Sequence, residues 1–254
     1  IDLCDGIRFW RRPAGVIERL GELPGVPAES DLTIRAARRL AERARSDCPG
    51  VAIEVQKRIP MQGGVGGGSS DAATVLVALN ELWNLGLKSV ELAAIGAELG
   101  ADVPVFVHGR AAWAEGIGEQ LTPLDFPEPV FLLVQPDVAV STAEVFKDPE
   151  LTRDSPAIKI RDSLTTGGRN DCEPVVRRRF PAVAEALDWL GQFGPARLTG
   201  TGSCVFAVMP SDEAARAALD CVPARWVGHV VRGLNRSPLI GRLALERDGP
   251  GAGR

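Results

Sequence analysis

Apolar residues recur along much of the chain at the three- and four-residue spacing of an amphipathic helix. In residues 32–45 the apolar positions share one face, arginine and glutamate occupy the other, and Ser30 or Asp31 stands where a cap is needed. The same pattern predicts helices over residues 70–83, 89–99, 180–193 and 212–219, with Ser69 or Ser70 capping the first and Ser89 the second.

Other stretches show the spacing or the apolar runs of β-strands. Val51, Ile53 and Val55 alternate with polar neighbours, which predicts a strand over residues 51–59. We expect further strands over residues 1–10, 101–107, 130–134 and 226–231, a strand, turn and strand over 197–209, a loop or short helix over 141–151, and a loose tail over 249–254. Residues 123–129 hold three prolines, which predicts a boundary between two domains, residues 1–122 and 123–254.

Composition and charge are those of an ordinary globular protein. The chain has 254 residues, 45% of them hydrophobic and 24% charged, enough for one large or two modest domains. A net charge of −4 argues against a nucleic-acid surface. No apolar run approaches the ~18 residues that a membrane span needs, and no signal peptide is visible. We therefore expect a cytoplasmic protein that binds neither nucleic acid nor membrane.

The cysteines do not form a metal-binding pattern. There are five, they are scattered, and no two are spaced as Cys-x-x-Cys; the chain also has only two histidines. This argues against a zinc or iron–sulfur site and favours free, mostly buried thiols in a reducing compartment.

The most informative stretch is a glycine segment, residues 60–73, that lies between the predicted strand and the helix predicted from residue 70. Five of the six residues from Gly63 to Gly68 are glycine, and Ser69, Ser70 and Asp71 follow. Glycines allow backbone N–H groups to converge on an anion, and the first amides of a helix add to them. The alternative is a turn that only connects two elements, which needs fewer glycines. The segment is neither a Walker P-loop, which ends in Gly-Lys-Ser/Thr, nor the dinucleotide fingerprint.

Asp102 is the best candidate for a catalytic acid–base group. It stands between a helix-ending glycine and an apolar stretch, where a carboxylate is not needed for solubility. Phosphoryl transfer needs a group that accepts the proton of the attacking hydroxyl as the new bond forms, and an aspartate suits that role. A turn former that satisfies its own backbone is an equally good interpretation. For Phe146 an exposed stacking platform and a core residue both stay open, and the small-residue turn at residues 199–203 alone favours a tight hairpin.

Taken together these segments resemble the GHMP small-molecule kinases. Residues 60–73 are similar to the second motif of that family, residues 100–106 to its catalytic-aspartate segment and residues 198–206 to its third motif. Residues 146–151 and 170–173 are similar to those of members that phosphorylate a cytidine diphosphate-linked methylerythritol in non-mevalonate isoprenoid biosynthesis. The likeness runs from about residue 1 to residue 243.

The resemblance implies an α+β fold of two lobes, an N-terminal ATP-binding lobe and a C-terminal ferredoxin-like lobe. It implies ATP and Mg²⁺, transfer of the γ-phosphate to a hydroxyl of the methylerythritol part, and a monomer or weak homodimer. Asp102 would be the catalytic aspartate, Ser70 would help hold Mg²⁺, and Asp31 stands where the family often has an asparagine near the adenine. The ATP-binding residues implied are Pro60, Met61, Gln62, Gly63, Gly64, Val65, Gly66, Gly67, Gly68, Ser69, Ser70 and Asp31. The substrate-binding residues implied are Asp102, Thr142, Phe146, Gly200, Thr201, Gly202 and Ser203.

The chain departs from the family at its front. The family's first motif carries a catalytic lysine and then a Tyr-His pair, yet the chain opens at Ile1 without a methionine and contains no tyrosine. Lys57 does not match that motif. We expect the missing motif to lie upstream of Ile1, the alternative being an impaired relative that binds ATP without turnover. A kinase acting on homoserine or a mevalonate is the other alternative.

Overall fold

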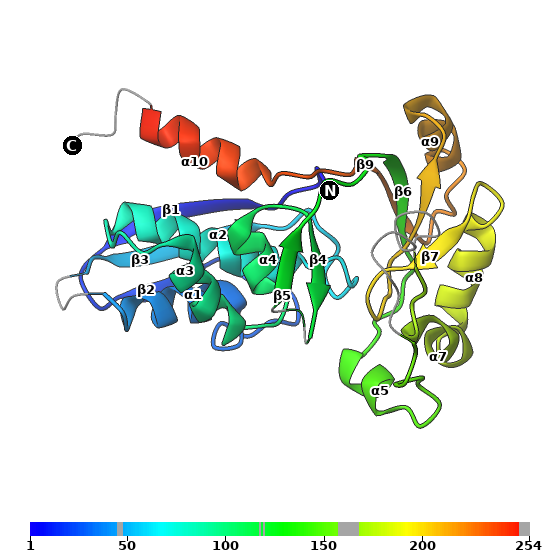
Figure 1. Cartoon of the computed structure of the whole chain (residues 1–254), viewed down its shortest axis with the longest axis horizontal. Coiled ribbons are helices and arrows are strands. Elements are labelled where there is room, and N and C mark those ends of the chain that lie inside the picture. Colours follow the sequence, from blue (N-terminus) through cyan, green and yellow to red (C-terminus); the bar gives the residue numbers. More distant parts are fainter. Residues whose placement is uncertain (45–47, 117, 119, 157–167, 249–254) are drawn as a thin grey trace. The chain divides into compact units, whose positions relative to one another are not determined.

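The computed structural model describes residues 1–44, 48–116, 118, 120–156 and 168–248, and they fall into two compact units (Figure 1). The N-terminal unit comprises residues 4–58, 66–125 and 235–254, and the C-terminal unit residues 1–3, 59–65 and 126–234. The glycine segment passes from the C-terminal to the N-terminal unit between Val65 and Gly66. Because each unit is assembled from separate stretches, the two domains expected as 1–122 and 123–254 stay a prediction.

The N-terminal unit is a small sheet with helices packed on one another beside it. Its three strands, in the order β1-β3-β2, are β1 (Gly6–Arg12), β2 (Ile17–Leu20) and β3 (Gly50–Gln56). Strand β1 runs antiparallel to β3, and β2 runs parallel to it. The helices are α1 (Leu32–Ala41), α2 (Gly67–Leu82), α3 (Ser89–Ala97), α4 (Val103–His108) and α10 (Pro238–Asp248), and a hairpin is made by β4 (Ala112–Glu115) and β5 (Gln120–Pro123).

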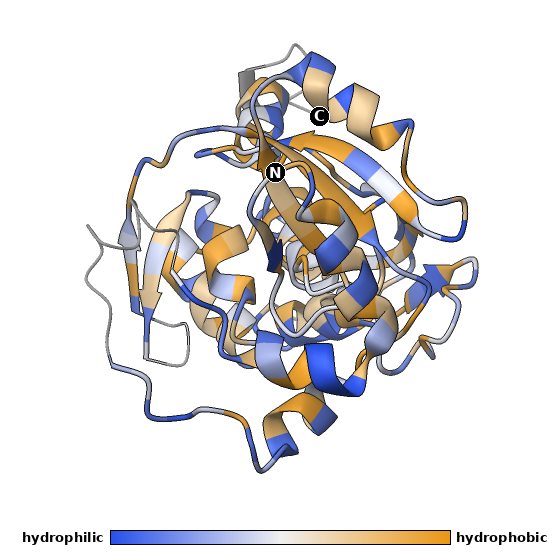
Figure 2. Ribbon diagram, turned by 90° about the vertical axis from the view of Figure 1, so that its right-hand side faces the viewer, coloured by the Kyte–Doolittle hydropathy of each residue, from blue (hydrophilic) through white to orange (hydrophobic). Residues whose placement is uncertain are grey.

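Helix α2 is the centre of this unit's core. Ala72, Val75, Leu76 and Leu79 on it are fully buried, among side chains of α1, β3, α3 and α4. Figure 2 shows hydrophobic and hydrophilic residues following one another along the helices, the pattern from which the helices were predicted. The buried body of α2 fixes the helix start, where the glycine segment ends.

The C-terminal unit has a ferredoxin-like arrangement of one four-stranded antiparallel sheet and helices. The strands, in the order β7-β8-β6-β9, are β6 (Val130–Gln135), β7 (Ala196–Leu198), β8 (Val205–Met209) and β9 (Val227–Arg232). The helices are α5 (Thr142–Lys147), α7 (Cys172–Arg179), α8 (Pro181–Leu190) and α9 (Asp212–Leu219). A strand, helices, two adjacent strands, a helix and a last strand follow one another, which is the order of a ferredoxin-like fold. The expected α+β class is confirmed.

Most predicted elements are present, with shifted ends. Helices predicted over residues 32–45, 70–83, 89–99 and 180–193 are α1, α2, α3 and α8, and the one predicted over 212–219 is α9. The short-helix alternative for residues 141–151 is realised as α5. No helix in the described ranges is long and apolar enough to cross a membrane. The tail predicted at residues 249–254 lies outside the described residues.

Three local predictions were wrong. Residues 101–107 form not a strand but a turn and most of α4, which has Pro104 in its first turn and is followed by Gly109 in the left-handed conformation. Proline is favoured in the first turn of a helix, and a five-residue apolar run does not distinguish strand from helix. The strand expected from residue 1 begins only at Gly6. The N-cap positions of α2 and α3 are occupied by Gly66 and Lys88, not by the predicted serines, which lie inside the helices.

Candidate active site

Helix α2 begins at the end of the glycine segment, where an anion site was predicted. Gly66 precedes the helix with φ +74°, a backbone conformation that glycine adopts without strain. A Cβ on Gly66 would lie 2.8 Å from Cζ of Phe106 on α4, so that ring would have to shift to admit any other residue. No side chain caps the helix. The first amides of α2 therefore have neither an intrahelical acceptor nor a side-chain acceptor, which favours an anion at this end.

Ser70 lies in the first turn of α2. Its hydroxyl donates a 2.8 Å hydrogen bond to the Gly67 carbonyl, so it does not cap the helix. The oxygen keeps its lone pairs and fits a hydroxyl ligand for a cation. Among the described ranges no three His, Cys, Asp or Glu side chains cluster as a metal site.

Lys57 lies between the buried carboxylates of Asp5 and Asp71, and Asp71 is in the first turns of α2. Its Nζ is 2.9 Å from Asp71 Oδ2 and also pairs with Asp5. Burial, the largest cause, raises the pKa of Asp71 to about 7; Lys57 opposes the rise and Asp5 adds to it. One ammonium group cannot neutralise two buried carboxylates, so a proton is retained near neutral pH. Lys57 thus forms ion pairs inside the N-terminal unit. This role agrees with the observation that Lys57 does not match the family's lysine motif.

Asp102 directly precedes α4 and is exposed. Its side chain makes no capping bond, which removes the support for a turn former. Helix α4 packs against α2, and a Cβ on Gly100 would lie 4.0 Å from Ser69 Oγ. The start of α4 therefore lies beside the start of α2, and the free carboxylate is on the segment next to the predicted anion site.

The first half of the glycine segment is bound to the turn at residues 199–204 within the C-terminal unit. Thr199 Oγ1 donates to the Gly64 carbonyl at 2.7 Å. The backbone N–H groups of Ser203 and Cys204 donate to the carbonyls of Gln62 and Gly63, at 3.3 and 3.1 Å. These hydrogen bonds therefore join two glycine-rich turns, and the bonded residues Gly64 and Thr199 are 135 residues apart in sequence.

A cavity of about 390 Å³ lies where these turns meet the start of α5. It brings together four residues predicted to bind ligands and two that were not predicted. Thr142 is fixed by a 2.8 Å hydrogen bond between its hydroxyl and that of Thr201. The residues lining the cavity are Gln62, Gly64, Val140, Ser141, Thr142 and Gly202.

Ser203 is the only side chain in the described ranges with a buried N or O atom that lacks a hydrogen-bond partner. It is fully buried and directly follows Gly202 in the cavity wall. An unsatisfied buried hydroxyl costs about 1–3 kcal/mol, so such a group calls for an explanation. Ser203 lies in the predicted substrate segment but does not line the cavity, so its contact with a substrate stays a prediction.

Comparison with known proteins places this arrangement in a family. A family model described as GHMP kinases N terminal domain matches residues 31–110, and one described as GHMP kinases C terminal matches residues 154–228. A Nitrosococcus oceani protein named 4-diphosphocytidyl-2-C-methyl-D-erythritol kinase is 55% identical over 249 residues, 98% of this chain and 88% of that protein. A Halorhodospira halophila protein of the same name is 57% identical over 245 residues, 94% of this chain and 84% of that protein. The chain belongs to the GHMP kinase family.

Solved structures agree with the GHMP kinase assignment. A crystal structure of 4-(cytidine 5'-diphospho)-2C-methyl-D-erythritol kinase superposes with a TM-score of 0.75 at 31% identity, covering 91% of this chain and 86% of the other. Homoserine kinase from Cytophaga hutchinsonii gives 0.67 at 17% identity, over 92% and 86%, and shows a shared fold alone. The chain is accordingly a small-molecule kinase with the two-lobe fold that the resemblance implied.

In this GHMP kinase Phe146 is exposed rather than part of the core. It lies on α5 with 56% of its surface accessible, which excludes the core interpretation. Arg153 donates to the carbonyls of Phe146 and Asp148, and buried Asp148 is paired with Arg178 and Arg179. A network of charged hydrogen bonds thus holds an exposed aromatic ring on a short helix.

Asp31 is occupied in capping α1. Oδ1 accepts hydrogen bonds from the N–H and hydroxyl of Thr33, at 2.8 and 2.7 Å, and Oδ2 is 3.2 Å from Arg19. The side chain is 3% exposed. Both carboxylate oxygens therefore already have partners within the N-terminal unit. The contact of Asp31 with adenine stays a prediction.

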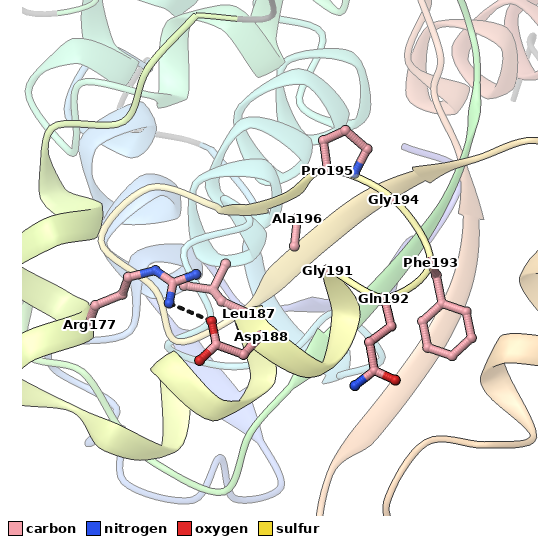
Figure 3. A pocket seen from close by; sticks show the side chains of 9 residues that line it. All are labelled: Arg177, Leu187, Asp188, Gly191, Gln192, Phe193, Gly194, Pro195 and Ala196. Carbon is pink, nitrogen blue, oxygen red and sulfur yellow. Dashed lines mark hydrogen bonds and ion pairs between the residues drawn. The ribbon is translucent and has the colours of Figure 1, made fainter.

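A larger hollow of about 850 Å³ at the end of α8 includes none of the predicted site residues (Figure 3). The Arg177 guanidinium and Asp188 carboxylate face each other across one side at 2.8 Å, and the Phe193 ring stands at the other end of the view. Its charged groups are already paired with each other. Size alone favours this hollow, but the smaller cavity at the glycine turns has the chemistry.

Proposed function

We propose that the chain transfers the γ-phosphate of ATP to the 2-hydroxyl of 4-diphosphocytidyl-2-C-methyl-D-erythritol, a step of non-mevalonate isoprenoid biosynthesis in the cytoplasm. The observation that carries this is that proteins named for that substrate match 94–98% of the chain at 55–57% identity. The glycine segment and the α5 segment both fall within the matched length.

In this proposal the start of α2 binds phosphate. The uncapped amides that follow Gly66 supply hydrogen bonds and the positive end of the helix dipole to the polyphosphate of ATP. Ser70 offers an oxygen to Mg²⁺, which would neutralise phosphate charge. Magnesium in kinase sites is bound by the substrate's phosphates together with one or two protein oxygens, commonly carboxylates, and the Ser70 hydroxyl is proposed as one such oxygen.

Asp102 is proposed to orient the attacking hydroxyl and take its proton. Its exposed carboxylate, free of a cap, is available to a substrate, and it lies on the segment beside the α2 start. An aspartate with an ordinary pKa of about 3.9 does not deprotonate an alcohol in the ground state. It accepts the proton as the bond to phosphorus forms, which phosphoryl transfer permits.

Phe146 and the cavity residues are proposed to recognise the cytidine end. An exposed ring on α5 provides a surface on which a base can stack. Thr142, held by Thr201, provides a hydroxyl at the cavity wall, and Gly202 leaves room beside it. These features favour a substrate with an aromatic base over homoserine or mevalonate, which have none.

A coupled assay of ADP release tests the proposal. With ATP and the cytidine substrate the full-length protein should form ADP, whereas homoserine or mevalonate should give no more ADP than ATP alone. Phe146→Ala should raise KM for the cytidine substrate about tenfold with KM for ATP unchanged, because a stacked base is worth about 1–3 kcal/mol. Phe193→Ala, which truncates a 36% exposed ring at the other hollow, is the control. ADP formed only with another alcohol would contradict the proposed substrate.

A further inference from the structure

Asn170 holds the turn that follows β7 although it is about 30 residues away in sequence. Its Nδ2 donates to two carbonyls, Leu198 at 3.0 Å and Gly200 at 2.7 Å. Its Oδ1 accepts from the backbone N–H of Cys172 at 3.0 Å, at the start of α7. One side-chain amide therefore uses both its donor and its acceptor groups to join α7 to the turn.

A second group on α7 supports the same strand end. The Glu173 carboxylate accepts from the backbone N–H of Leu198 at 3.2 Å, and its other oxygen accepts from Arg177 at 3.3 Å. The two side chains thus engage both the N–H and the C=O of Leu198, which is buried. This gives a structural role to the Asn-Asp-Cys-Glu stretch that sequence analysis singled out without one.

The turn held by Asn170 is the one that fixes the glycine segment. Gly200 has φ +53°, and a Cβ there would lie 3.2 Å from the Gly64 carbonyl oxygen. Thr199, between the two carbonyls that Asn170 binds, donates its hydroxyl to that same oxygen at 2.7 Å. The two carbonyls that Asn170 binds thus flank Thr199, which joins the two turns, and Gly200 is two residues from the cavity-lining Gly202.

We infer that Asn170 is a positioning residue, which sets the 199–203 turn against Gly64 and so shapes the cavity without lining it. The inference rests on the proposed function for its kinetic consequence alone. Two donors on one planar group are needed, because the carbonyls of Leu198 and Gly200 both accept. An aspartate has the same size but no donor when ionised, and it would place negative charge against two carbonyl oxygens.

The test uses Asn170→Asp and Asn170→Ala with Asn80→Asp as the matched control. Asn80 also bridges backbone groups with its side-chain amide, since it donates to the Leu87 carbonyl and accepts from the Leu87 N–H, but it belongs to the N-terminal unit. At a temperature where all variants are folded, both Asn170 variants should lower kcat by at least about tenfold, since misplacing groups by 1 Å can cost about 10²-fold. The control should keep kcat. Equal losses in all three variants, or an unchanged kcat in the Asn170 variants, would overturn the inference.

Hydrogen exchange separates this inference from the proposed substrate. The amides of Ser203 and Cys204 bond to the glycine segment, so in Asn170→Ala they should exchange at least about tenfold faster than in the parent chain, and in Asn80→Asp at the parent rate. Unchanged exchange at these amides would overturn the positioning role whatever the enzyme acts on. Faster exchange with no activity of the full-length protein on the cytidine substrate would overturn the proposed function and keep the positioning role.

Discussion

Gly64 is the position where a single methyl group tests the joined turns most sharply. It has φ +72°, and a Cβ would lie 2.3 Å from the Thr199 carbonyl oxygen and 3.0 Å from that of Gly202. Gly86 provides a matched control, because it has φ +69° and a Cβ there would meet no atom within 4 Å. The two alanine variants share the cost of a left-handed backbone and differ in the contact alone.

The structure sets the size of each effect. The left-handed conformation costs an alanine about 1–2 kcal/mol, and this should be the whole loss in Gly86→Ala. In Gly64→Ala the methyl group meets backbone atoms, which cannot turn aside as a side-chain tip can, so the turn must move. Overpacking of this kind costs typically about 1–3 kcal/mol more. Because Gly64 and Gly202 both line the cavity, the movement also disturbs the site.

Urea unfolding and steady-state kinetics on both variants measure the two effects. We expect Gly64→Ala to be less stable than Gly86→Ala by about 1–3 kcal/mol and to lose at least about tenfold in kcat/KM, while Gly86→Ala keeps the parent kcat/KM. Two variants that unfold at the same urea concentration and turn over alike would refute the close packing of Gly64 against the 199–203 turn.

Two further predictions concern buried polar groups. Because burial raises the pKa of Asp71 to about 7, above its unfolded value near 3.8, the folded chain binds more protons there than the unfolded chain between these values. The free energy of unfolding should therefore fall as the pH rises through this range, by at most about 1.4 kcal/mol per pH unit from this group. Urea unfolding at several pH values should show a smaller fall in Asp71→Asn. The same pH dependence in the variant and the parent chain would count against a raised pKa of Asp71. Ser203→Ala removes a buried hydroxyl without a partner, so its Tm in the absence of substrate should equal or exceed that of the parent chain. A Tm several degrees lower would show that the hydroxyl has a partner.

Periodic patterns predicted the helices well because burial on one face is recorded directly in the sequence. Helix α9 begins and ends where the pattern does, at Asp212 and Leu219. Helix α4 is too short to show a period, and only Pro104 in its first turn could have indicated a helix. The cap of α2 was missed because the left-handed backbone of Gly66 starts the helix without any side chain. Helix α10 was not predicted, because its apolar residues do not form one clear face.

Part of the candidate site was predicted from the sequence and part was not. Sequence motifs predicted four residues that line one cavity: Gln62, Gly64, Thr142 and Gly202. The hydrogen bonds of Asn170 run from a side chain to distant backbone carbonyls, which leaves no spacing to read in the sequence. For such contacts the only signal was a short polar stretch at residues 170–173 whose role was unassigned.

In the proposed phosphoryl transfer, Asp102 takes the proton of the attacking hydroxyl beside the phosphate bound at the start of α2. The rate of ADP release with ATP and the cytidine substrate tests this role when the full-length protein is compared with its Asp102→Asn variant. The asparagine variant keeps the size of an exposed side chain that makes no capping bond, so the fold and ADP binding should be unchanged. We predict a kcat lower by at least about 10²-fold. A variant as fast as the parent protein would show that Asp102 does not take the proton.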